Sequence, residues 1–146
     1  MMLREYLENE FLYKEDWNCA EHMLIGADRV YGLKLDREAY KLAAGFGGGM
    51  AVGGICGALT GAIMAQGMLF VQERAHEGEK IKVLTAELIG RYRQRMGEVD
   101  CIPLKEHYRT EEIKCRDVIL EAASILDDIV IRELPGAAFV AKARGI

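Results

Sequence analysis

Apolar residues recur at intervals of three and four along most of the chain, the spacing of helices that bury one face. Leu3, Tyr6, Leu7 and Phe11 show this pattern near the N-terminus. The pattern is divided by expected helix stops at Gly32 and Gly97 and by expected caps at Asp16, Asp36 and Thr110. The resulting segments predict helices over 2–13, 16–31, 36–44, 54–74, 78–96, a short stretch from 101, and 110–130. No segment alternates as a strand does. The predicted fold is all-α, an irregular helical bundle in one domain over 1–146, with 131–146 as a possible C-terminal arm.

The predicted helix over 54–74 is the candidate for the centre of the bundle. It belongs to a run from 42 to 72 that contains no Asp, Glu, Lys or Arg. Small residues recur along it at helical spacing, which lets other helices approach closely. A membrane span is the alternative interpretation of such a run. Its glycines dilute the hydrophobicity and the other helices are amphipathic, so we expect a buried helix and no membrane span.

Charge and the N-terminal segment narrow the functional classes. The net charge is −4, and no basic patch indicates nucleic-acid binding. The N-terminus lacks the apolar core and cleavage site of a signal peptide, so we expect a cytoplasmic protein with reduced thiols. The faces of small residues suggest a possible homodimer.

Four cysteines are the main candidates for chemistry, and they lie on separate segments: Cys19, Cys56, Cys101 and Cys115. A single cysteine is usually a small buried hydrophobe, but four in one small cytoplasmic domain favour redox or metal chemistry. No C-x-x-C occurs, so a zinc ribbon or a thioredoxin-type dithiol is not indicated. Any shared site must be assembled by folding.

The glycines around Cys56 have two interpretations. Gly54, Gly57 and Gly61 could allow tight helix packing. They could also leave room for a cofactor beside the thiol, with exposed backbone N–H groups that stabilise a thiolate.

Other chemical motifs are weak or absent. The glycine run matches neither G-x-G-x-x-G nor a P-loop, so no nucleotide is expected, and without C-x-x-C-H no covalent haem is expected. His22, three residues after Cys19, could supply a nitrogen ligand, although a surface or hydrogen-bonded core histidine is more usual. The carboxylates of Asp127 and Asp128 are expected at a solvated helix end.

Several short motifs together resemble the C_GCAxxG_C_C family of redox-active proteins over roughly residues 14–130. They are Asn-Cys-Ala at 18–20, Phe-Gly-Gly-Gly at 46–49 and Cys-Gly-Ala-Leu-Thr-Gly at 56–61, followed in order by Cys101 and Cys115. The family name places a glycine before the cysteine, whereas here Gly57 follows Cys56. The resemblance implies a small helical protein, mostly of anaerobic bacteria and archaea, with redox activity inferred from its cysteines. A similar domain occurs in split-Soret-type cytochromes, where the cysteines are associated with non-haem iron.

Three hypotheses follow. The leading one is a single buried site in which the four thiolates hold an iron–sulfur cluster or another metal ion for electron transfer with an unidentified redox partner. The second is a thiol–disulfide oxidoreductase that pairs Cys101 with Cys115, or Cys19 with Cys56. Cys101 would be its nucleophile because it lies at a helix start. The third is a structural protein with an all-cysteine zinc site.

Overall fold

The computed structural model describes residues 1–136, and within them it is all-α without a β-strand, as predicted. The longer helices are α2 (Cys19–Tyr31), α3 (Gly57–Phe70), α4 (Lys80–Met96), α5 (Cys101–Tyr108) and α6 (Arg116–Glu133). Shorter elements are α1 (Leu3–Tyr6), the π-helical turns η1 (Leu7–Phe11) and η3 (Gly49–Gly53), and the 3₁₀ segments η2 (Arg37–Phe46) and η4 (Ala75–Glu77). No helix in this part of the chain is both long and apolar enough to cross a membrane.

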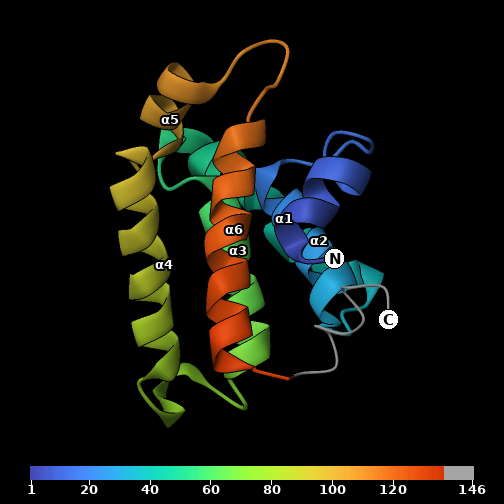
Figure 1. The fold of residues 1–146 in the computed structure, drawn as a ribbon, viewed down its shortest axis with the longest axis vertical. Coiled ribbons are helices and arrows are strands. Elements are labelled where there is room, and N and C mark those ends of the chain that lie inside the picture. The colour runs from blue at the N-terminus through green and yellow to red at the C-terminus, as the bar shows by residue number, and fades with distance from the viewer. Residues whose placement is uncertain (137–146) are drawn as a thin grey trace.

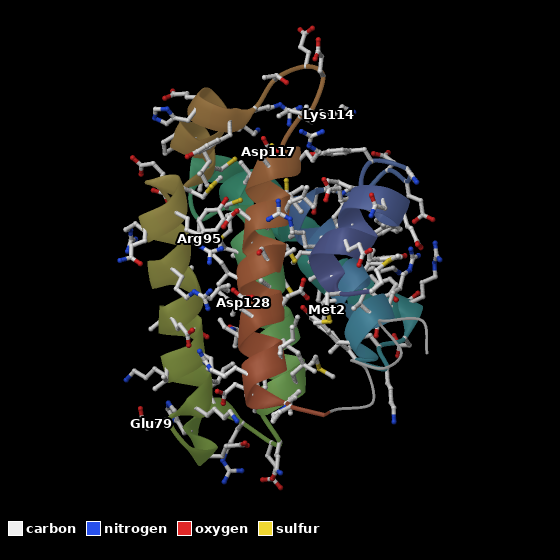
Figure 2. The ribbon with its side chains drawn as sticks, viewed as in Figure 1. Met2, Glu79, Arg95, Lys114, Asp117 and Asp128 are labelled. Carbon is white, nitrogen blue, oxygen red and sulfur yellow. The ribbon has the colours of Figure 1, made fainter. Side chains whose placement is uncertain are left out.

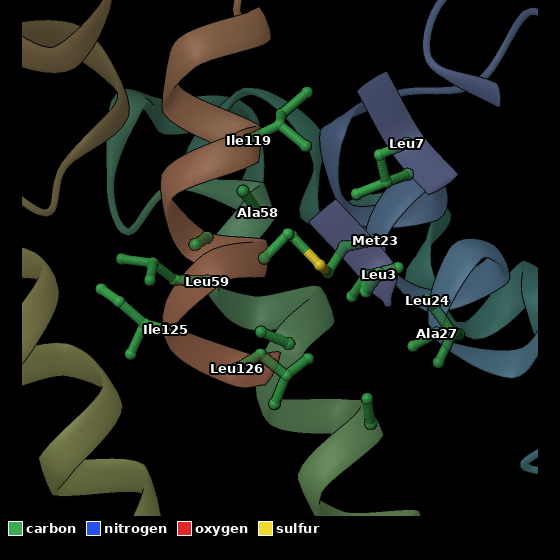
Figure 3. Packing of buried hydrophobic residues seen from close by; sticks show 14 of the residues in the cluster. Leu3, Leu7, Met23, Leu24, Ala27, Ala58, Leu59, Ile119, Ile125 and Leu126 are labelled. Atoms are coloured by element: carbon green, nitrogen blue, oxygen red, sulfur yellow. The ribbon is translucent and has the colours of Figure 1, made fainter. Parts of the chain in front are cut away.

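Helix α3 is the centre of the bundle, as the charge-free run predicted. It contacts α2, α4 and α6, and in Figure 1 it stands behind α6 with α4 on one side and α1 and α2 on the other. Side chains from α1, η1, α2, α3 and α6 meet in one continuous core, where Met23 lies near Leu3 and Ala58 (Figure 3). A helix that is apolar on every side is stable only when it is surrounded in this way.

Ion pairs join the exposed edges of α4 and α6. Arg91 lies 2.7 Å from Asp128, and Arg95 lies 2.6 Å from Glu121. Figure 2 labels Arg95 and Asp128 where the two helices face each other. Exposed pairs of this kind contribute at most about 1 kcal/mol each, so the buried apolar face is the main cause of this packing.

Several helix ends agree with the sequence patterns. Gly32 ends α2 with φ of 70° and Gly97 ends α4 with φ of 82°, both left-handed conformations that glycine adopts easily. The Asp36 side chain accepts a hydrogen bond from the N–H of Ala39, although the segment that follows is a 3₁₀ helix. The cap of α2 is Asn18 rather than Asp16, and Asn18 forms a reciprocal pair of hydrogen bonds with Glu21.

The central helix begins later than predicted, because the glycine segment before it turns with the opposite hand. Residues 48–51 all have φ between 60° and 66°, including the non-glycine residues Met50 and Ala51. Gly49 packs tightly here, since an added Cβ would lie 2.3 Å from the carbonyl oxygen of Gly54. Helix α3 therefore starts only at Gly57, and it ends at Phe70 rather than at residue 74.

The expectation for Asp127 was wrong, because its carboxylate is buried. It accepts hydrogen bonds from the backbone N–H groups of Leu3 (2.9 Å) and Arg4 (3.0 Å) and from the hydroxyl of Tyr31 (2.6 Å). Burial raises the pKa of this carboxyl group, while these hydrogen bonds act in the opposite direction. Asp127 therefore anchors the N-terminal helix to α6.

The C-terminal prediction is tested only in part. Helix α6 continues to Glu133, so the first residues of the expected arm are helical. Residues 137–146, which form most of that arm, lie outside the described part of the chain.

Candidate functional site

All four cysteines line one pocket of about 530 Å³. Each lies at the start of a different helix: Cys19 is the first residue of α2, Cys56 precedes α3, Cys101 is the first residue of α5 and Cys115 precedes α6. The N-terminus of a helix carries partial positive charge and free N–H groups, which favour a thiolate. Four such ends converge on this pocket, so its walls favour negatively charged sulfur.

Cys56 and Cys101 are held together through the backbone. The N–H of Cys56 donates to the carbonyl of Val99 at 2.8 Å, and the N–H of Cys101 donates to the carbonyl of Gly54 at 2.6 Å. Burial raises the pKa of the Cys56 thiol to about 11, although the backbone N–H groups of Ala58 and Leu59 act against this.

Cys19 and Cys115 form a hydrogen-bonded thiol pair. That bond, with the guanidinium of Arg109 3.2 Å from the Cys115 sulfur, lowers the pKa of Cys115 below the usual range of a thiol, while burial opposes the shift. The same bond to Cys115, together with burial, raises the pKa of Cys19. Because the Arg109 guanidinium contacts the Cys115 sulfur, Cys115 is the thiol of the pair that favours the thiolate form. The sequence analysis had favoured the pairs Cys101–Cys115 and Cys19–Cys56, with Cys101 as the nucleophile.

Tyr13 and His22 support this pair from the N-terminal segment. The hydroxyl of Tyr13 accepts the N–H of Cys115 at 2.9 Å. Nε2 of the buried His22 ring accepts the N–H of Tyr13 at 3.2 Å, and Nδ1 lies 3.1 Å from the carbonyl oxygen of Asn18. Burial lowers the pKa of His22, consistent with a neutral ring. His22 is thus a hydrogen-bonded core residue, as favoured, and it is not among the residues that line the pocket.

The three glycines singled out from the sequence have different surroundings. Gly57 lines the pocket, and Gly54 supplies the carbonyl that holds Cys101. At Gly61 an added Cβ would lie 2.7 Å from the carbonyl oxygen of Ala20 and 2.8 Å from Cβ of Met23. Gly61 therefore permits the close approach of α2 and α3, in agreement with the packing interpretation.

The four thiols match the donor set of an iron–sulfur cluster or of a soft metal ion. Among residues 1–136, however, no group of three or more His, Cys, Asp or Glu side chains is arranged to hold a metal ion. The donor chemistry of the four thiols fits a metal centre, and their proximity in one pocket also fits thiol–disulfide chemistry.

Two residues of the candidate site were missed from the sequence. Arg109 could have been noticed as a cation six residues before Cys115, with a turn between them that brings the two together. Tyr13 gives no such signal, because it is far from Cys115 along the chain.

Comparison with families of known proteins adds a finding of its own. Residues 17–129 match the family described as "Putative redox-active protein (C_GCAxxG_C_C)". The chain belongs to this family. The matched region contains all four cysteines and confirms the resemblance stated from the motifs. No curated protein and no solved structure matches the chain.

Proposed function

We propose that this redox-family protein transfers electrons through the Cys19–Cys115 pair by thiol–disulfide exchange. The observation that supports this most directly is the contact of the Arg109 guanidinium with the sulfur of Cys115, which lines the same pocket as Cys19. A thiolate is the nucleophile in such exchange, and a protonated partner beside it is a suitable resolving thiol.

The reaction proceeds in two displacements. The Cys115 thiolate attacks one sulfur of a substrate disulfide, R–S–S–R; the S–S bond breaks, a mixed disulfide forms and RS⁻ leaves. The negative charge on Cys115 is then gone, so the main cause of the raised pKa of Cys19 disappears. Cys19 loses its proton to water and attacks Cys115, which closes the Cys19–Cys115 disulfide and releases a second RS⁻. Two electrons pass from the protein to the substrate.

Single-cysteine variants test this assignment. We expect reduced protein treated with 2-hydroxyethyl disulfide to form a Cys19–Cys115 disulfide, detected by peptide mass spectrometry. Cys115→Ser should abolish the fast reaction, and Cys19→Ser should trap the mixed disulfide on Cys115. Cys56→Ser is the matched control and should retain both steps. A fast reaction that survives in Cys115→Ser, or a disulfide between a different pair, would contradict the proposal.

The second candidate is a metal centre held by all four thiolates. The observation that favours it is the convergence of four cysteines and four helix N-termini on one pocket. An iron–sulfur cluster bound there would carry single electrons. The sequence analysis ranked this function first.

Metal analysis and an absorption spectrum of protein purified without oxygen separate the candidates. Iron with sulfide and a visible charge-transfer band would establish a cluster, and each cysteine-to-serine variant should then lose it. Zinc without a redox response would identify a structural site. Protein without metal, with thiols that oxidise reversibly in pairs, would support the exchange reaction.

A further inference from the structure

The pocket that holds the four cysteines has a cationic lining in a chain of net negative charge. Four cations line it: Lys14, Lys105, Arg109 and Lys114. Its two carboxylates are Glu15 and Asp16, and Glu15 lies 3.7 Å from Arg29, outside the pocket lining. The whole chain has a net charge of −4. Positive charge is therefore concentrated where the thiols lie.

None of the four cations has a carboxylate partner among residues 1–136, and Lys14 donates to the carbonyl oxygen of Asn9. Within residues 1–136, no acidic side chain lies within 4.0 Å of the charged groups of Lys105, Arg109 and Lys114. Arg109 contacts the Cys115 sulfur directly, whereas Lys105 influences that thiol only through space. Cations that lie together without counter-charges repel one another, and a bound anion would relieve this electrostatic repulsion.

Lys114 directly precedes the reactive Cys115 in the chain. Its ammonium group lies 5.1 Å from the centre of the Tyr13 ring, and its N–H donates to the carbonyl of Thr110 at 2.8 Å. Figure 2 labels Lys114 in the loop that leads into α6. Its φ of 53° is a left-handed conformation that a non-glycine residue adopts only where the surroundings impose it. The loop therefore fixes the backbone at Lys114, and its ammonium group lies against Tyr13 in the pocket lining.

We propose that the pocket binds a small disulfide bearing carboxylate or phosphate groups, and that Lys105 and Lys114 hold those groups while Cys115 reacts with the disulfide. The inference rests on the exchange reaction proposed above and names its substrate class. A volume of about 530 Å³ suits a small molecule rather than a folded partner. Trp17 and Leu104 supply apolar wall for the carbon skeleton, and RS⁻ leaves with its anionic group attached.

Three disulfides of similar skeleton and different charge test the proposal: 3,3′-dithiodipropionate (anionic), 2-hydroxyethyl disulfide (neutral) and cystamine (cationic). Each rate of reaction with Cys115 is divided by the rate of the same disulfide with 2-mercaptoethanol, an uncharged thiol, which removes intrinsic reactivity. We expect the anionic probe to react fastest and to saturate, and the cationic probe to react slowest.

Lysine variants assign the preference to this site. Lys105→Gln and Lys114→Gln should each lower the ratio of anionic to neutral rate about two- to fivefold, and the double variant should lower it further. The ratio is used because Lys105→Gln also changes the thiolate fraction of Cys115, which affects both probes equally. Lys82→Gln, at an exposed position on α4, is the matched control and should leave the ratio unchanged.

The outcomes separate the two proposals. If no probe reacts at Cys115, the exchange function fails. If all three react without a charge preference, the function stands and the substrate class is wrong. If the preference survives in the double variant, the function stands and the assignment of the anion site to Lys105 and Lys114 is wrong. Succinate and inorganic phosphate, added at constant ionic strength, should compete with the anionic probe, and the stronger competitor identifies the preferred group. No competition by either would overturn the binding site.

Discussion

At the scale of single residues, the reactivity of Cys115 has several identifiable sources. The residue precedes α6, its sulfur lies 3.2 Å from Arg109, and the thiol of Cys19 is its neighbour and hydrogen-bond partner. Each of these stabilises the thiolate relative to the thiol, whereas burial opposes it. Because Arg109 is exposed, solvent screens its contribution, and the hydrogen bond with Cys19 is the largest cause.

The pH dependence of alkylation tests the role of Arg109. The lowered pKa of Cys115 means that its reaction with iodoacetamide should stay fast below the usual thiol range and slow only as the pH falls through that pKa. Arg109→Gln removes a stabilising charge, so the midpoint should move upward and the rate at pH 6 should fall about threefold or more. Arg93→Gln, at an exposed position on α4, is the control. An unchanged midpoint in Arg109→Gln would rule out this role.

The residues of the site were largely predictable from the sequence, but their pairing was not. The order and number of the cysteines were enough to predict a site assembled by folding, and the pocket brings all four together. The pairing of Cys19 with Cys115 depends on where two helices begin. Helix starts are set by contacts such as the bond from the N–H of Cys115 to the hydroxyl of Tyr13, 102 positions apart, which no local pattern reveals.

At the scale of elements, the contact between α2 and α3 depends on the absence of a side chain. Gly61→Ala places a methyl group against Ala20 and Met23, so we expect it to lower the free energy of unfolding by about 1–3 kcal/mol. Urea unfolding measures this change.

Gly67→Ala is the matched control in the same helix. Nothing lies within 4 Å of an added Cβ there, and alanine has the better helix propensity. We expect this variant to raise the free energy of unfolding by about 0.5–1 kcal/mol. Equal effects at Gly61 and Gly67 would contradict the close approach of α2 and α3.

The elements themselves show where sequence patterns succeed and where they fail. The stops at Gly32 and Gly97 were predicted because one glycine there determines the left-handed conformation. The starts of α3 and α6 were placed too early, at 54 and 110. Met50, Ala51 and Lys114 adopt left-handed conformations that their residue types disfavour, so tertiary contacts impose those turns.

At the scale of the whole molecule, Asp127 joins the beginning of the chain to its last long helix. Asp127→Ala leaves the N–H groups of Leu3 and Arg4 without this acceptor, so we expect a loss of about 2–4 kcal/mol of unfolding free energy. Faster amide exchange in α1 should accompany it. Asp128→Ala, which removes only exposed ion pairs, should cost less than about 1 kcal/mol. Similar losses in both variants would mean that the anchor is unimportant.

Oxidation should change global stability if Cys19 and Cys115 form a disulfide. The bond would join the starts of α2 and α6 and so constrain most of the unfolded chain. For a loop of this length, the entropy model gives a gain of up to about 5 kcal/mol. We expect the oxidised protein to unfold at higher urea concentration than the reduced protein. The double variant Cys19→Ser/Cys115→Ser should show no such difference, and a difference that persists in it would assign the effect to other thiols.

A disulfide between Cys19 and Cys115 would also change the covalent topology of the chain. A bond between Cys19 and Cys115 would close the chain between them into a covalent ring that contains α2, α3, α4 and α5, with the N-terminal helix and α6 as two tails. A single peptide cut inside the ring would leave one covalent molecule, whereas the same cut in the reduced protein would yield two fragments. A protease acting on the loop between α3 and α4 would therefore report the redox state as one band or two on a denaturing gel run without reductant.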